Sequence, residues 1–163
     1  MGEDKYLIKL FDKSFKGKFL DVGCYHPTRH NNTFIMYKRG WSGINIDLNP
    51  FTIELFNYLR PRDININVGV SDTEEEKKLN FIDEFNTQNT LDNNQLNFLK
   101  KHHNIKDTEI LEKKIMTRNL NNILDDHKFY NIDFMNLDIE GHELSVLKTL
   151  NFNKFKIKYV NIP

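Results

Sequence analysis

The clearest structural signal in this chain is the stretch Asp133-Phe-Met-Asn-Leu-Asp-Ile-Glu-Gly-His-Glu143. A strand-like apolar run ends there in a cluster of ionisable side chains, and a helical pattern begins directly after it. Open α/β sheets present their reactive groups at strand–helix turns of this kind. A second strand end of similar design, Phe19-Leu-Asp-Val-Gly23, lies near the N-terminus. Together the two stretches predict an open α/β sheet with a site along one edge.

Short strand patterns alternate with helical patterns through the first half of the chain. Strands are expected at Lys18–Val22, Gly43–Asp47 and Ile64–Val70, with helices over residues 33–39 and 51–59 between them. The order β-α-β-α-β predicts a doubly wound, Rossmann-like parallel sheet with right-handed crossovers.

The other elements are expected on both sides of this unit. An amphipathic helix is expected over residues 4–15, before the first strand. The irregular middle, 73–117, is interpreted as an insertion or an extra hairpin. Because the chain shows neither repeats nor a flexible linker, residues 1–163 are expected to form one domain. The remaining segments are strands over 77–82 and 109–117, a helix over 91–102 between them, a helix over 119–127, a strand over 132–138, a helix over 142–150 and a strand over 156–162.

The composition narrows the possible partners and the compartment. Lys plus Arg and Asp plus Glu both number 23, so neither nucleic acid nor an anionic membrane is an expected partner. The single cysteine, Cys24, excludes an intramolecular disulfide and a multi-cysteine metal site. The N-terminus lacks a secretory signal pattern, and no apolar run approaches the roughly 20 residues that span a bilayer. We therefore expect a soluble, cytoplasmic protein; its oligomeric state is not indicated.

Acidic residues end three successive predicted strands, at Asp21, Asp47 and Asp72. Gly23 lets the backbone turn tightly beside a ligand. Asp47 occupies the position from which doubly wound nucleotide sites bind the two ribose hydroxyls. Ser71 and Asp72 would contact an adenine at the same edge. Acids and glycines at strand ends also form ordinary turns, but three in order favour an adenosine-containing ligand.

The loop after the first strand is poor in glycine. After Gly23 the next glycine is Gly40. The Gly-x-Gly-x-x-Gly loop that admits a pyrophosphate instead has its second glycine two residues after the first. This argues against a nicotinamide dehydrogenase, and the absence of a GxxxxGK[ST] loop argues against ATP hydrolysis. An adenosine ligand without phosphates fits better, and S-adenosylmethionine is the commonest such cofactor.

The cluster Asp138, Glu140, His142 and Glu143 has three interpretations. Carboxylates and imidazole are good ligands for hard or borderline cations. Alternatively, His142 or Glu140 acts as a general base towards a substrate hydroxyl. Finally, Glu140 and Glu143 lie where carboxylates stabilise a helix N-terminus. Asp138 ends a buried strand and is expected to face a ligand; no metal is included among the expected cofactors.

The chain resembles the FkbM family of S-adenosylmethionine-dependent methyltransferases, which have the class I Rossmann-like fold. The resemblance covers most of the chain, and the matching stretches follow one another in the same order as in the family. The matching stretches are FLDVGCYHP, YKRGWSGINIDLNP, RPRDININVGVSD, QNTLD, TRNLNNIL and IDFMNLDIEGHELSVLKTLNF.

The resemblance implies a role for each matching position. Asp47 would bind the ribose hydroxyls, and Asp138 would lie near the amino group and the sulfonium of the cofactor. Glu140 and His142 would lie near the substrate and are the catalytic candidates. The cofactor-binding residues expected on this basis are Asp21, Gly23, Cys24, Tyr25, Asp47, Leu48, Ser71, Asp72 and Asp138.

Two features depart from the family pattern. Pro27 stands where class I enzymes usually have a glycine. The chain ends at residues 160–163, so the last two strands of the seven-stranded fold are expected to be missing, either because this is a fragment or because the sheet is abridged.

The leading hypothesis is an O-methyltransferase that acts on a hydroxyl of a glycan or small molecule, with that acceptor class implied by the resemblance. The methyl group would move by in-line displacement, and a base would remove the hydroxyl proton. The alternative is a degenerate module that binds an adenosine cofactor without turnover.

Overall fold

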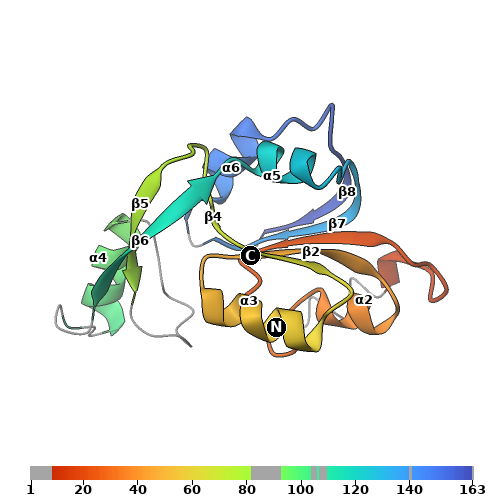
Figure 1. The fold of residues 1–163 in the computed structure, drawn as a ribbon, viewed down its shortest axis with the longest axis horizontal. Coiled ribbons are helices and arrows are strands. Elements are labelled where there is room, and N and C mark those ends of the chain that lie inside the picture. Colours follow the sequence, from red (N-terminus) through yellow and green to blue (C-terminus); the bar gives the residue numbers. More distant parts are fainter. Residues whose placement is uncertain (1–8, 82–92, 104–105, 107–109, 140, 163) are drawn as a thin grey trace.

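A parallel five-stranded sheet forms the centre of the protein (Figure 1). The computed structural model describes residues 9–81, 93–103, 106, 110–139 and 141–162. The strand order β3-β2-β1-β7-β8 confirms the predicted doubly wound sheet. Its strands are β1 (Lys18–Val22), β2 (Ser42–Asp47), β3 (Ile64–Asn67), β7 (Asn131–Leu137) and β8 (Lys156–Asn161).

Helices cover both faces of this sheet. The helices α2 (Phe34–Lys38) and α3 (Pro50–Leu59) lie on one face, and α5 (Leu120–Asp126) and α6 (Glu143–Thr149) lie on the other (Figure 1). The main apolar core lies between the sheet and the second pair of helices, and it includes buried residues of β1, β2, β7, α5 and α6. The predicted helices at 33–39, 51–59, 119–127 and 142–150 are confirmed to within one or two residues.

The sheet order places the ends of three strands beside one another. β1 pairs with β2 on one side, and with β7 on the other. In these pairings Val22 lies opposite both Ile46 and Leu137, so the three strands end at about the same level. The chain passes from β1 to β2 on one side and from β7 to β8 on the other, so the connections after β1 and β7 run in opposite directions. Doubly wound sheets open a crevice for ligands at such a point.

The third predicted strand, Ile64–Val70, is wrong as a single element. The chain leaves β2 at Val68, whose N–H donates to the Asp47 carbonyl oxygen over 3.1 Å. The next two residues form β4 (Gly69–Val70), which pairs with β6 in a second sheet. A Cβ on Gly69 would lie 3.0 Å from Ile115 Cδ1, so the glycine permits this close approach. The alternation of apolar and polar residues predicted an extended segment, but it could not indicate which strand the segment pairs with.

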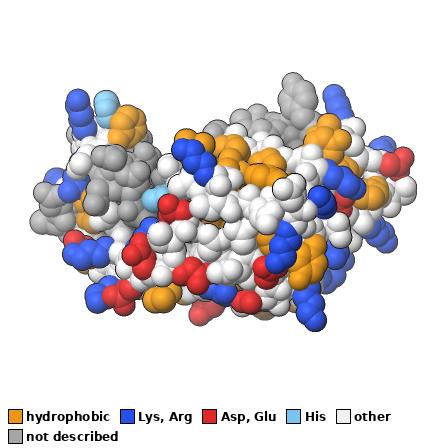
Figure 2. All heavy atoms as spheres, turned by 90° about the horizontal axis from the view of Figure 1, so that it is seen from above, with side chains coloured by type: hydrophobic (Ala, Val, Ile, Leu, Met, Phe, Trp, Pro, Cys, Tyr) orange, Lys and Arg blue, Asp and Glu red, His pale blue; other side chains and the backbone are white. Residues whose placement is uncertain are grey.

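Two antiparallel strands from the irregular middle of the chain form a ribbon that projects from one side of the central sheet (Figure 1). Strands β5 (Glu76–Phe81) and β6 (Leu111–Arg118) are antiparallel, and α4 (Asn93–His103) lies between them in sequence. This confirms the extra hairpin and its helical segment. In the space-filling view, acidic and basic side chains are both spread over the described part of the visible face (Figure 2).

The predicted N-terminal helix over residues 4–15 is only partly described. Lys9 and Leu10 are helical, and the chain turns from Phe11 onwards, so the prediction is wrong for residues 11–15. The Asp12 carboxylate accepts hydrogen bonds from the N–H and hydroxyl of Ser14, over 2.8 and 2.6 Å. This local bonding competes with helix formation and closes a turn instead.

Two helices end in the same capping geometry. After α2, the Gly40 N–H donates to the Tyr37 carbonyl, with Gly40 at φ 90°. After α5, the Lys128 N–H donates to the Asp125 carbonyl in the same way, with Lys128 at φ 52°. Gly40 adopts this left-handed conformation without strain, whereas a lysine does not. None of the helices in the described part of the chain is long and apolar enough to cross a membrane.

Candidate functional site

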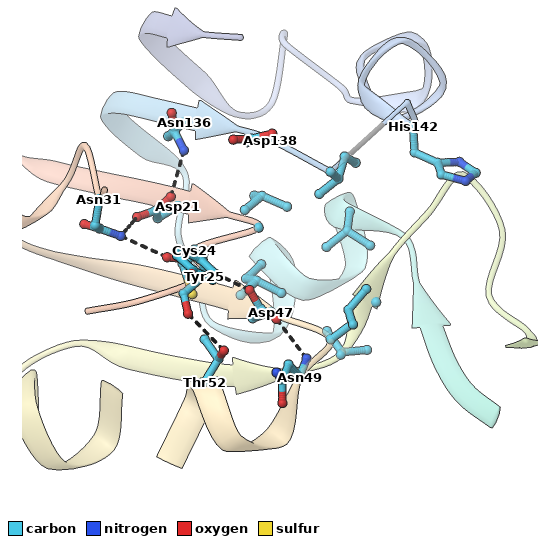
Figure 3. Close-up of a pocket in the computed structure, with 18 of the residues that line it drawn as sticks. Asp21, Cys24, Tyr25, Asn31, Asp47, Asn49, Thr52, Asn136, Asp138 and His142 are labelled. Atoms are coloured by element: carbon cyan, nitrogen blue, oxygen red, sulfur yellow. Dashed lines mark hydrogen bonds between the residues drawn. The ribbon is translucent and has the colours of Figure 1, made fainter. Parts of the chain in front are cut away.

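A cavity of about 440 Å³ opens at the carboxyl ends of β1, β2 and β7 (Figure 3). Its volume lies within the range of small-molecule and cofactor sites. The strand ends that carry Asp21, Asp47 and Asp138 therefore form one wall. The predicted site residues that line the cavity are Asp21, Gly23, Cys24, Tyr25, Asp47, Leu48, Asp138 and His142.

Asp47 presents a carboxylate that two backbone groups hold in place. Its Oδ2 accepts from the Tyr25 N–H over 2.9 Å, and its Oδ1 accepts from the Asn49 N–H over 2.8 Å (Figure 3). Burial raises the pKa of Asp47 from 3.8 to about 6, although these two hydrogen bonds favour the charged form. Each carboxylate oxygen has more than one acceptor site, so Asp47 can still receive two hydroxyl donors.

Asp21 is fully buried and is bound by three side chains. Its Oδ2 accepts from Asn31 Nδ2 over 2.9 Å and from Thr33 Oγ1 over 2.7 Å. Its Oδ1 accepts from Asn136 Nδ2 over 3.0 Å. Asp21 thus joins the first loop to β7 at the base of the cavity.

Gly23 lies where the end of β1 meets the end of β7. Its φ is +75°, and a Cβ there would come within 1.8 Å of the Asp138 carbonyl oxygen. The Asp138 N–H donates to the Val22 carbonyl over 2.9 Å, which fixes this approach. Only glycine allows the two strand ends to lie so close, and the contact places Asp138 on the cavity wall.

The loop after Gly23 contributes backbone rather than reactive side chains. The Tyr25 carbonyl accepts from Thr52 Oγ1 over 2.9 Å, and the residue has a left-handed φ of 53°. The Cys24 side chain is buried against Ile53 and Phe56. Burial, assisted by the negative charges of nearby aspartates, raises the pKa of the Cys24 thiol well above its ordinary value. A thiol with a raised pKa stays neutral and is a poor nucleophile, so the described part of the structure gives Cys24 no feature that activates it.

The start of α6 separates the members of the ionisable cluster. The Glu143 carboxylate accepts from the Ile139 N–H over 2.9 Å and from the Gly141 N–H over 3.0 Å. Glu143 does lie in the first turn of α6, as the helix-terminus interpretation expected, but its carboxylate binds the loop before the helix. His142 instead lines the cavity, and its buried Nε2 has no hydrogen-bond partner within the described structure. Glu140, the other catalytic candidate, lies outside the described residues.

The metal interpretation of this cluster finds no ligand set in the structure as described. Across residues 9–81, 93–103, 106, 110–139 and 141–162, no three His, Cys, Asp or Glu side chains are grouped to hold a metal ion.

Ser71 and Asp72 are not brought together with the other predicted site residues. The residues just before them in the chain, Val68, Gly69 and Val70, line the cavity instead. The buried Ser71 hydroxyl accepts from Lys77 Nζ over 2.8 Å and donates to Asp72 Oδ1 over 3.0 Å. The physical reason is the break at Val68, after which the chain pairs with the ribbon instead of continuing beside β2.

Several cavity residues were not identified from the sequence. The buried Asn136 had a usable signal, because it is an amide inside an otherwise apolar strand. Thr52 had none, because it is one polar residue on an amphipathic helix. The cavity residues without an individual prediction are Val22, His30, Asn31, Asn32, Ile46, Asn49, Thr52, Val68, Gly69, Val70, Asn136 and Ile139.

Comparison with known proteins identifies one family. The sequence model of the methyltransferase FkbM domain matches residues 21–162, a range that contains every residue of the cavity wall. Searches among curated proteins and among solved structures gave no significant match. Since the family match spans far more than half of the 163 residues, the chain belongs to the FkbM methyltransferase family.

Proposed function

We propose that this protein is an S-adenosylmethionine-dependent methyltransferase that O-methylates a hydroxyl of a glycan or small molecule. The observation that carries the proposal is the Asp47 carboxylate, which two backbone N–H groups fix at the end of β2, on the cavity wall. A carboxylate in this position suits the paired hydroxyls of a ribose. The family supplies the reaction class, methyl transfer.

The charges around the cavity suit this cofactor. Its described wall contains three carboxylates, of Asp21, Asp47 and Asp138, and neither lysine nor arginine. Such a wall favours a ligand with positive charges, and S-adenosylmethionine carries a sulfonium and an ammonium group. It disfavours the diphosphate of a nicotinamide dinucleotide, in agreement with the glycine-poor loop. Leu48, Val68 and Val70 add apolar surface suited to a base.

We assign each wall residue a part in this chemistry. Bound cofactor would supply a methyl group activated by the sulfonium. Asp47 would hold the ribose, and Asp138 would attract the positive charge at the other end. His142 would accept the proton of the acceptor hydroxyl, since the residue lines the cavity and its Nε2 has no hydrogen-bond partner within the described structure. Holding acceptor and cofactor together would supply much of the rate.

A comparison of ligands tests the cofactor. Isothermal titration calorimetry and thermal unfolding would compare S-adenosylhomocysteine with NAD. At 100 times the Kd, a bound ligand stabilises the fold by about 2.7 kcal/mol. For a chain of this size that raises the Tm by about 5–10 °C. Stabilisation by NAD alone, or by neither ligand, would refute the proposal.

Two matched variants locate the binding. Asp47→Ala should abolish binding of S-adenosylhomocysteine, because it removes the ribose acceptor. Asp72→Ala is the control: Asp72 is exposed and lies outside the cavity wall, so affinity should not change. If Asp72→Ala weakened binding as much as Asp47→Ala, Asp72 would contact the adenine as the sequence predicted.

A panel of hydroxyl acceptors then tests transfer. Incubation with S-adenosylmethionine labelled in its methyl group should move label to a glycan or small-molecule hydroxyl. Tight cofactor binding without label transfer to any acceptor would favour the non-catalytic binding module.

A further inference from the structure

The loop that replaces a glycine-rich turn contains no glycine after Gly23, yet two of its residues adopt a strained backbone conformation. Over residues 23–33, Tyr25 and His30 adopt left-handed φ values of 53° and 48°. Residues with a side chain avoid this region, and they remain in it where the surrounding structure fixes them. Both line the cavity, so whatever fixes this loop also fixes the shape of the cavity.

Arg60, which follows α3, lies directly behind this loop and is fully buried. Its Nε pairs with Asp63 Oδ2 over 2.9 Å. Its Nη1 donates to Thr33 Oγ1 over 3.0 Å and to Asn31 Oδ1 over 3.1 Å. One guanidinium group thus holds two residues of the loop through directed hydrogen bonds.

Thr33 and Asn31 carry this constraint to the cavity wall. The Thr33 hydroxyl accepts from Arg60 and donates to Asp21 Oδ2 over 2.7 Å. Asn31 Nδ2 donates to the same Asp21 oxygen over 2.9 Å and to the Cys24 carbonyl over 3.0 Å. An unbroken path of hydrogen bonds therefore leads from the end of α3 to the cavity residues Asp21 and Cys24.

Aromatic packing fixes the position of the guanidinium itself. Its central carbon lies 5.0 Å from the ring centres of Phe19 and Phe56 and 4.9 Å from that of Tyr37. A planar guanidinium can pack on rings and donate several bonds at fixed angles, which a lysine ammonium cannot do. A buried ion pair is a weak source of stability compared with apolar packing. The distinctive effect of the Arg60–Asp63 pair is that it holds the guanidinium in a fixed position.

We infer that Arg60 and Thr33 are positioning residues, which preform the cofactor cavity by holding the glycine-poor loop through Asp21 and Asn31. The inference rests on the proposed function for the identity of the cofactor. A loop that is already ordered loses less entropy when ligand binds. Arg60 and Thr33 therefore raise affinity although neither of them lines the cavity.

The hydroxyl of Thr33 can be tested with two variants of opposite design. Thr33→Val keeps the shape but removes the hydroxyl that joins Arg60 to Asp21. Thr33→Ser keeps the hydroxyl and loses only a methyl group. Thr117→Val is a matched control, because Thr117 is also fully buried and its hydroxyl donates to the Thr73 carbonyl over 2.9 Å, in the ribbon.

Two measurements detect a change in affinity and in the order of the loop. Both are made under conditions where each variant is fully folded. Calorimetry measures the Kd for S-adenosylhomocysteine, and hydrogen exchange measures protection of the backbone amides of residues 23–33 without ligand. Thr33→Val should weaken binding about 10-fold and speed exchange in the loop about 10-fold, since hydrogen bonds to charged groups have about this strength. Thr33→Ser and Thr117→Val should both behave like the unaltered protein. Thr33→Ala, which also removes the hydroxyl at a position that does not line the cavity, replaces Thr33→Val if that variant does not fold.

The outcomes separate this inference from the proposed function. Failure of the unaltered protein to bind S-adenosylhomocysteine would refute the cofactor assignment, and loop exchange would still decide whether the network orders the loop. Unchanged binding and exchange in Thr33→Val would overturn the inference. An equal loss of affinity in Thr33→Val and Thr117→Val would also overturn it, because general destabilisation would then explain the effect.

Discussion

Asp47 makes cofactor affinity depend on pH in a way that follows from its surroundings. In the free cavity its pKa is raised from 3.8 to about 6, chiefly by burial. A shift of this size corresponds to a cost of about 3 kcal/mol for ionising the carboxylate in the folded protein. Since the folded-state pKa is the higher one, this group contributes stability that is complete below pH 3.8 and is lost as the pH rises through about 6.

Ligand binding should reverse this preference. Ribose hydroxyls donate hydrogen bonds, so they favour the ionised carboxylate, which accepts on both oxygens. Binding therefore competes with a proton at low pH. With a pKa of about 6, about nine-tenths of the free protein is protonated at Asp47 at pH 5 and about one-tenth at pH 7. We expect S-adenosylhomocysteine to bind about 10-fold more weakly at pH 5 than at pH 7.

Calorimetry between pH 5 and pH 8 would measure this dependence. Repeating the titrations near pH 6 in buffers of different ionisation enthalpy would detect the release of protons on binding. Two variants identify the titrating group: Asp47→Asn should bind weakly at every pH, and His142→Gln should keep the dependence. An affinity that is constant from pH 5 to pH 7, or one whose dependence disappears in His142→Gln, would refute this reasoning.

Three further predictions concern the backbone at the cavity, a helix end and the catalytic candidate. Gly23→Ala should lower the free energy of unfolding by about 2–5 kcal/mol, because its Cβ would meet the Asp138 carbonyl at 1.8 Å. In urea titrations Gly40→Ala, with a left-handed φ but only Lys16 side-chain atoms at 3.4 Å or more from the new Cβ, should cost only about 1–2 kcal/mol, and equal losses would contradict the clash. Lys128→Gly should stabilise the fold by about 0.5–1 kcal/mol by relieving its left-handed φ, and a lower Tm would show that the strain is absent. His142→Gln should lower kcat about 10²- to 10⁴-fold while the Kd for S-adenosylhomocysteine changes less than about twofold, and an unchanged kcat would exclude His142 as the base.

Much of the fold follows from local pattern. Short apolar runs that end in turn residues located β1, β2, β7 and β8, and helical periodicity located the elements between them. Parallel strands in a doubly wound sheet end on the same edge, so Asp21, Asp47 and Asp138 could be placed together from the sequence. The cavity wall contains all three.

The adenine-side prediction shows where local pattern is insufficient. Apolar and polar residues alternate over 64–70, as they do in a strand. Ser71 and Asp72 follow this segment directly, so they look like the acidic ends of the other predicted strands. Alternation is a property of one segment, whereas strand pairing is a competition between segments distant in the chain. β6 forms the partner of Gly69–Val70, and this takes Ser71 and Asp72 away from the cavity wall.

The sequence alone determined the order of the elements, the edge of the sheet that carries the site and the residues that end its strands. These depend on periodicity and on turn chemistry, which act over a few neighbouring residues. Only the tertiary structure decided that Arg60 supports the first loop, that Asp21 is held by Asn31, Thr33 and Asn136, and that burial raises the pKa of Asp47 to about 6. Burial and hydrogen bonding between distant segments produce these properties, and they exist only once the chain has packed.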